Sequence, residues 1–180
     1  MKKICFMLLA LLGSAVLISA CHKDDSQVYS QVGDQNFVND ASSSNSFEIQ
    51  AARLAMSRGV SDSVKVFADS MVNDNSKIAA SLSVVASQNG FTIPTTLQPV
   101  DQNNLNNLNT LTGVAFDKQY AAIMVTAHQG VFSLYTSAAA INGVGNANLR
   151  AFAGAQATGL QTQLSLSERL AQAVGGESGQ

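Results

Sequence analysis

Apolar residues recur at spacings of three and four over most of the chain, which is the pattern of amphipathic α-helices. The clearest segment runs from Phe116 to Tyr135, and one of its faces is apolar. His128 lies within that face and is the only histidine after His22. A long helix with an ionisable group on its apolar side requires partner helices to cover that side. The apolar face consists of Phe116, Tyr120, Ile123, Met124, Ala127, Val131, Leu134 and Tyr135.

Three further long segments have the same period. We expect a first helix over about 34–58, with a kink or break at 42–46, because serine and asparagine compete with the helix for backbone hydrogen bonds. A second helix is predicted from Ser61, its N-cap, to Asn89, since a glycine follows as a terminator. The last helix is expected over about 146–174, after a glycine-rich turn.

The remaining segments connect these helices. Leucines at every third position predict a short helix over about 101–111, after a loop that holds both prolines. No segment of useful length alternates as a β-strand does. Four long amphipathic helices with short connections predict an all-α fold, an antiparallel four-helix bundle over 34–174. Residues 175–180 are expected to form a disordered tail.

The first 20 residues have the features of a signal peptide. Two lysines precede an apolar run over 4–18, which is too short for a stable membrane span, and small residues follow. The sequence Leu-Ile-Ser-Ala-Cys at 17–21 resembles the bacterial lipobox, in which the cysteine becomes the lipid-bearing first residue of the mature chain. We therefore expect cleavage after Ala20 and lipidation of Cys21, which would attach the protein to a membrane. The alternative is an ordinary signal peptide with an incidental cysteine.

The polar residues after Cys21 predict a flexible tether over 21–33. Lys-Asp-Asp at 23–25 resembles the signal that exports some Bacteroidota lipoproteins to the outer face of the outer membrane, although a solvated tether explains it equally well. With Cys5 in the signal peptide and Cys21 acylated, the mature domain has no free thiol for a disulfide, a zinc-thiolate site or a nucleophile.

The composition of the chain argues against nucleic acid as a partner. The chain is 46% hydrophobic but only 12% charged, with a net charge of −2. Removal of Lys2 and Lys3 with the signal peptide would leave eight basic against 12 acidic residues. An acidic chain without a basic patch is a poor candidate for nucleic-acid binding.

Polar residues interrupt the apolar stripes near the middle of each long helix. They are Glu48, Asn75 with its neighbour Asp74, His128 and Gln163. In an up-and-down bundle, mid-helix positions lie at similar heights, so these side chains are expected to form one buried polar layer. Bundles build metal sites in this way, and His128 with Glu48, supported by Asp74, would be the ligands.

A structural role is the alternative for the same residues. One histidine and one well-placed carboxylate fall short of the ligand set of a di-iron bundle. A hydrogen-bonded layer, with His128 bonded to Glu48 or to an amide, would fix the register of the helices instead. We expect Asp69, Asp74 and Asp117 to be exposed helix charges. Tyr120 and Tyr135 are expected to pack in the bundle with their hydroxyls near its edge. A single histidine without a defined partner does not make a catalytic triad.

Three blocks of sequence resemble a known family. They are Glu-x-x-x-Ala-x-x-Ala at 48–55, Val-Lys-Val-Phe-Ala-Asp-Ser-Met-Val-Asn-Asp at 64–74, and Gly-Val-Ala-Phe-Asp-Lys-Gln-Tyr from 113, followed by Met-Val and His128. Together they resemble the domain of unknown function 4142, a family of exported bacterial proteins, over about 37–170. The resemblance implies a ferritin-like helical bundle, an outer-membrane association and no established activity.

The chain departs from the pattern of that family at two positions. Asn75 stands where the family usually has histidine, and Gln163 stands where its last helix usually has another. The resemblance therefore implies weak or absent metal binding here. We expect a non-enzymatic envelope lipoprotein without a cofactor, which binds an envelope protein or a small ligand or has a structural role. The alternative is a ferritin-like metal-binding or oxidative-stress protein that holds a transition metal ion in the polar layer.

Overall fold

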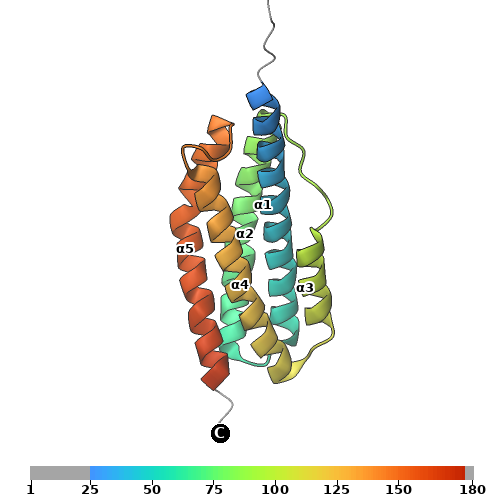
Figure 1. Ribbon diagram of the computed structural model, residues 1–180. Coiled ribbons are helices and arrows are strands. Elements are labelled where there is room, and N and C mark those ends of the chain that lie inside the picture. Colours follow the sequence, from blue (N-terminus) through green and yellow to red (C-terminus); the bar gives the residue numbers. More distant parts are fainter. Residues whose placement is uncertain (1–24, 177–180) are drawn as a thin grey trace, which may run out of the picture.

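The computed structural model describes residues 25–176, and its regular structure over this range is entirely helical (Figure 1). The all-α prediction is thus confirmed. The predicted signal peptide, Cys21 and the end of the predicted tail from 177 lie outside the described residues. None of the described helices is long and apolar enough to cross a membrane. The helices are α1 (Asp25–Arg58), α2 (Asp62–Gln88), α3 (Pro99–Asn109), α4 (Gly113–Ala139) and α5 (Ala147–Gly176).

Four long helices lie side by side, and the short α3 packs on the outside against α1 (Figure 1). α1 contacts α2 and α4, and α5 contacts the same two helices, so the four form a closed ring. We call these four helices the bundle. Short turns join α1 to α2 and α4 to α5, whereas a longer connection leads from α2 to α3. The start of α1, the end of α2 and the α4–α5 loop lie at one end of the bundle (Figure 1).

α1 is longer than the sequence pattern indicated. It begins at Asp25, whereas the apolar period placed its start near Asp34 and assigned 21–33 to a flexible tether. From Asp25 onward the structure thus has a helix in the segment that the sequence pattern assigned to a tether. Once tertiary packing has nucleated a helix, each further residue costs little, so a polar segment without a proline can extend it. α5 is also longer than predicted, since it continues to Gly176.

α1 also passes unbroken through 42–46, where a kink or break was predicted. The run stays helical because its side chains have partners that do not disrupt the helix. Ser42 and Asn45 donate to backbone carbonyls about one turn earlier in α1. Ser43 Oγ donates to Asp101 Oδ2 of α3 at 2.5 Å and accepts a backbone N–H from the loop before α3. The small polar residues thus form the surface on which α3 packs.

The turn between α1 and α2 is held by a side chain from α4. Ser61 is the N-cap of α2, as predicted, but its side chain makes no capping hydrogen bond. The backbone N–H groups of Val60 and Ser61 instead donate to the carboxylate of Asp117 at 2.8–3.2 Å. The prediction that Asp117 is exposed is wrong, because only 3% of its surface is accessible.

A second aspartate holds the α4–α5 loop at the opposite end of the bundle. Asp34 of α1 accepts hydrogen bonds from the backbone N–H groups of Gly145 and Asn146 at 2.6 and 2.9 Å. Asn146 then caps α5, since its Oδ1 accepts the backbone N–H groups of the residues two and three positions later. Gly143 lies in this loop so close to the last carbonyls of α4 that a Cβ there would collide with them.

The buried apolar side chains form two clusters along the bundle. The first lies toward the α1–α2 turn, and the second lies toward the start of α1. The first cluster includes Phe47, Phe67, Met71, Phe116, Tyr120, Met124 and Leu170. The second cluster includes Phe37, Ile78, Leu82, Val131, Tyr135, Leu149, Phe152 and Leu160.

Candidate site: a buried polar layer

Polar side chains separate the two apolar clusters. Each helix of the bundle contributes one of them, namely Glu48, Asn75, His128 and Gln163, which we call the polar layer. Their exposed fractions are 1%, 1%, 1% and 4%, so the structure buries all four. The layer therefore lies in the interior of the bundle.

The positions on α2 and α4 show how the sequence builds this layer. Asn75 lies between Met71 of the first cluster and Ile78 of the second, and His128 lies in the same way between Met124 and Val131. Seven residues make about two helical turns, so all three positions of each run lie on one buried face. Each helix thus carries one polar position inside an otherwise apolar stripe.

Asp74 does not belong to the polar layer, contrary to the metal-site hypothesis, and is an exposed helix charge, as the alternative expected. Its side chain is 47% exposed, and its carboxylate lies 3.3 Å from Lys77 Nζ on the surface of α2. One residue turns a helix by about 100°, so a neighbour of the buried Asn75 faces away from the core. Among the described residues, no three His, Cys, Asp or Glu side chains are grouped so that they could hold a metal ion.

His128 and Glu48 face each other at the centre of the layer. His128 Nδ1 donates to the backbone oxygen of Met124 at 2.7 Å. A carbonyl only accepts, so Nδ1 carries the proton, and in the neutral ring Nε2 has a free lone pair. Nε2 lies 3.6 Å from Glu48 Oε2, which is longer than a hydrogen bond. The predicted bond from His128 to Glu48 or an amide is thus replaced by a bond to its own helix.

The surroundings of Glu48 disfavour its ionised form. Burial raises the pKa of Glu48 above 4.5, while the charge of His128 and the nearby amide of Asn75 act in the opposite direction. Burial also raises the pKa of Asp101, which the hydroxyl of Ser43 lowers in part. Two carboxyl groups on or beside α1 therefore have environments that favour the protonated state.

Two tyrosines contribute to the same region, and the sequence pattern missed their role. Tyr120 and Tyr135 were expected to place their hydroxyls near the edge of the bundle, yet only 0% and 1% of their surfaces are exposed. Burial and the charge of Glu48 raise the pKa of Tyr120, and burial raises that of Tyr135. Both tyrosines lie on the face of α4 that carries His128. Their position on this apolar face is the sequence feature that indicates their burial.

The polar layer and the two tyrosines leave several hydrogen-bonding atoms without a partner. Six buried side-chain atoms among the described residues have no hydrogen-bond partner in the protein. An unsatisfied buried polar atom costs about 1–3 kcal/mol, so six of them would consume most of the stability of an ordinary domain. Buried water or an ion is the usual solution for such groups. The six atoms are Glu48 Oε1, Asn75 Nδ2, Tyr120 OH, His128 Nε2, Tyr135 OH and Gln163 Oε1.

Comparison with known proteins gives a family and no activity. Residues 20–170 match the model of the family described as "Domain of unknown function (DUF4142)". No curated protein and no solved structure matched the chain. The match includes all four residues of the polar layer and extends over most of the sequence. The chain therefore belongs to the DUF4142 family, as the three sequence blocks indicated.

Proposed function

We propose that this chain is a lipid-anchored protein of the bacterial cell envelope, at the outer membrane, and that its helical domain is a binding or structural module rather than an enzyme. The observation that carries the proposal is Cys21, which follows Leu-Ile-Ser-Ala in a lipobox-like segment. A cysteine with more than one acyl chain holds a protein stably on a membrane. Only three residues separate this cysteine from the start of α1 at Asp25.

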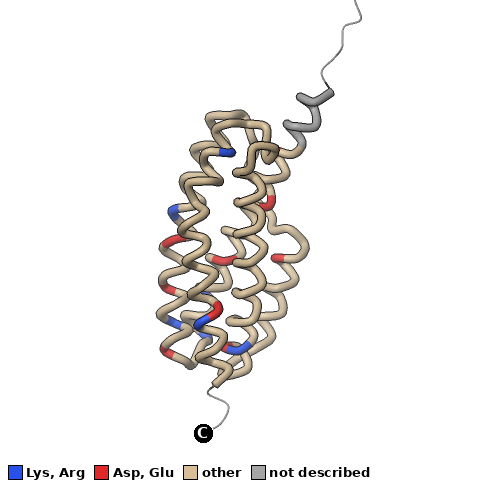
Figure 2. Tube along the Cα trace, turned by 60° about the vertical axis from the view of Figure 1, so that its left-hand side comes forward, with Lys and Arg blue, Asp and Glu red and all other residues tan. Residues whose placement is uncertain are grey.

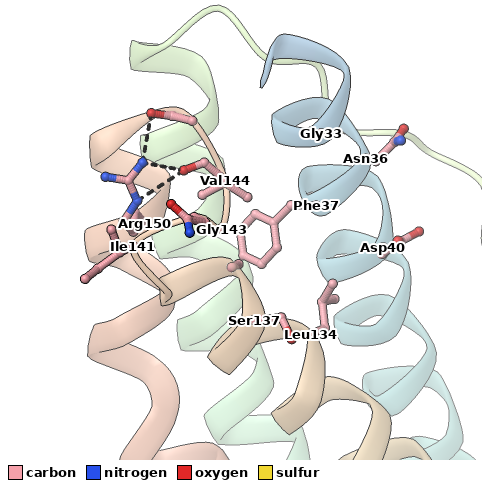
Figure 3. A pocket seen from close by; sticks show the side chains of 13 residues that line it. Gly33, Asn36, Phe37, Asp40, Leu134, Ser137, Ile141, Gly143, Val144 and Arg150 are labelled. Atoms are coloured by element: carbon pink, nitrogen blue, oxygen red, sulfur yellow. Dashed lines mark hydrogen bonds between the residues drawn. The ribbon is translucent and has the colours of Figure 1, made fainter. Parts of the chain in front are cut away.

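A groove near the start of α1 supports a binding role. It has a volume of about 790 Å³ and opens between α1, α4 and the α4–α5 loop (Figure 3). Phe37, Leu134 and Val144 give it apolar walls. The guanidinium of Arg150 lies at its rim, where it donates to the backbone oxygens of Val144 and Gly145.

The surface around this groove carries little charge. Lys, Arg, Asp and Glu are concentrated toward the opposite end of the bundle (Figure 2). The chain has none of these residues over 78–100 or over 119–149, which include the end of α2 and most of α4. An open groove with apolar walls, in which Asp40 and Arg150 are the charged lining residues, suits a small molecule with few charges or the apolar side chain of an envelope partner.

Two further observations support a module of this kind. Glu48 and His128 are each 1% exposed, so a substrate in solution does not reach the chain's central ionisable pair. The closed ring of contacts among α1, α2, α5 and α4 supports the ferritin-like antiparallel four-helix bundle that the family resemblance implies. The bundle then serves as a scaffold that presents the groove close to the membrane.

Acyl labelling of the full chain tests the anchor. Wild-type protein expressed with an alkyne-bearing fatty acid should carry the label and sediment with membranes. Cys21→Ser should lose the label, and Cys5→Ser is the matched control, because Cys5 lies in the segment predicted to be removed. Wild-type protein without label, or equal labelling of wild type and Cys21→Ser, would contradict lipidation at this residue.

A further inference from the structure

The side chain of His128 is held in an orientation and a tautomer that leave Nε2 able to bind an ion. The hydrogen bond from Nδ1 to Met124 O, at 2.7 Å, fixes both the tautomer and the orientation of the ring. The lone pair of Nε2 then points away from that bond, into the layer that contains Glu48. Histidines that bind metal ions commonly donate their second ring N–H to a backbone carbonyl in this way. This feature is independent of the anchor and of the groove.

The distance between His128 and Glu48 suits a shared ion better than a direct bond. Nε2 and Oε2 are 3.6 Å apart, which exceeds the usual limit of an N–H···O hydrogen bond. Two ligand atoms that each lie about 2.0–2.2 Å from one ion at a tetrahedral angle are about 3.3–3.6 Å apart. The observed separation is therefore the one expected across a small coordinated ion.

Further buried atoms of the polar layer and of Tyr120 have no hydrogen-bond partner. Glu48 Oε1 and Gln163 Oε1 are buried acceptors without a hydrogen bond, and both suit a cation or a water molecule bound to it. The hydroxyl of Tyr120 is also buried and unpartnered, so it is available to orient such water molecules. The carboxylate, the imidazole and the amide oxygen come from three different helices.

We propose that the polar layer is a binding site for a divalent transition-metal ion, with Glu48 and His128 as its protein ligands. Zn²⁺ is the best match, because it accepts mixed nitrogen and oxygen ligands in a tetrahedral arrangement and tolerates water at the remaining positions. Gln163 Oε1 or water completes the coordination. With only two ionisable ligands, the affinity is lower than that of a structural zinc site with four protein ligands.

The burial of the layer determines how the ion enters. Because Glu48 and His128 are each 1% exposed, an ion reaches them only when the helices of the bundle separate. Folded protein should therefore take up and release the ion slowly. Refolding in the presence of Zn²⁺ should load the site fully, whereas brief incubation of folded protein should not.

The test uses the full chain without a histidine tag, unfolded in denaturant and refolded in detergent with or without Zn²⁺. Bound metal is measured by mass spectrometry after gel filtration, and thermal unfolding is followed in parallel. Wild type should retain zinc near stoichiometry. Free Zn²⁺ at about 100 times the dissociation constant should raise its Tm by about 5–10 °C.

Matched variants distinguish zinc binding in the polar layer from zinc binding by other side chains. His128→Gln and Glu48→Gln should lose the zinc and the rise in Tm, while His22→Gln and Asp74→Asn should keep both. Co²⁺ provides a readout on wild-type protein that requires no variant to fold, because tetrahedral Co²⁺ absorbs strongly in the visible range. Wild type without retained zinc and without such absorption, or a His128→Gln protein that is folded and keeps its zinc, would overturn the proposal.

Discussion

Asp34 and Asp117 hold opposite ends of the bundle in the same way. Asp34 accepts two backbone N–H groups just before α5, and Asp117 accepts two just before α2. In the ring of helices, α1 lies opposite α5, and α4 lies opposite α2. Each aspartate therefore ties its own helix to the turn that leads into the helix diagonally opposite in the bundle.

Removal of these carboxylates should destabilise the fold at both ends. Each of Asp34→Ala and Asp117→Ala should lower the free energy of unfolding by about 1–3 kcal/mol, because two hydrogen bonds from backbone N–H groups to a carboxylate are lost. The two sites lie far apart and share no partner, so the double variant should show the sum to within about 0.5 kcal/mol. Urea unfolding measures both effects. The exposed Asp69→Ala is the control, and an equal effect there would contradict a specific role.

Glu48 should make the stability of the metal-free protein depend on pH. Because burial raises its pKa in the folded state, the folded protein binds this proton more tightly than the unfolded chain does. The free energy of unfolding should therefore fall as pH rises from about 4.5 through the raised pKa, by at most about 1.4 kcal/mol per pH unit.

Glu48→Gln should remove this part of the pH dependence. Relative to wild type, the variant should become progressively more stable as pH rises, as measured by urea unfolding in the presence of a chelator. Asp74→Asn is the control, because the side chain of Asp74 is 47% exposed. If the free energies of unfolding of wild type and Glu48→Gln changed with pH in parallel, ionisation of Glu48 would not lower the stability of the folded protein.

Two glycine substitutions should have opposite effects. Gly143→Ala should destabilise the protein by about 1–3 kcal/mol, because its Cβ would overlap the carbonyls of Ser137 and Ala138. Gly130 lies inside α4, and a Cβ added there would meet open space, so Gly130→Ala should stabilise by about 0.5–1 kcal/mol. Thermal unfolding of both variants provides the comparison, and equal shifts would contradict the close packing of the α4–α5 loop.

The apolar period was sufficient to locate the polar layer. Glu48, Asn75, His128 and Gln163 interrupt stripes that are otherwise apolar, and a helix with a buried stripe buries its interruptions as well. Asp74 shows the limit of this reasoning. It is adjacent to a buried position in sequence, yet it faces solvent, because the face on which a helical residue lies changes with every step.

The clamping aspartates and the tyrosine hydroxyls were not predictable in the same way. Asp117 follows the buried Phe116, and its partners are backbone groups of a turn more than 50 residues earlier in the chain. Side-chain periodicity contains no information about unpaired backbone donors in a distant turn. Tyr120 packs against Phe67 of α2, and Tyr135 packs against Phe37 of α1 and Phe152 of α5, so the burial of both side chains depends on how the helices pair.

The polar layer also divides the bundle into two halves that need not unfold together. The buried apolar side chains fall into two separate clusters, one around Phe116 and one around Phe152, and the backbones of the four helices run through both. Each half is then able to open and close as its own subglobal unit, with its own amide-exchange rate. An ion bound between the halves would join them into one unit, so its arrival would be detected as slower exchange throughout the molecule.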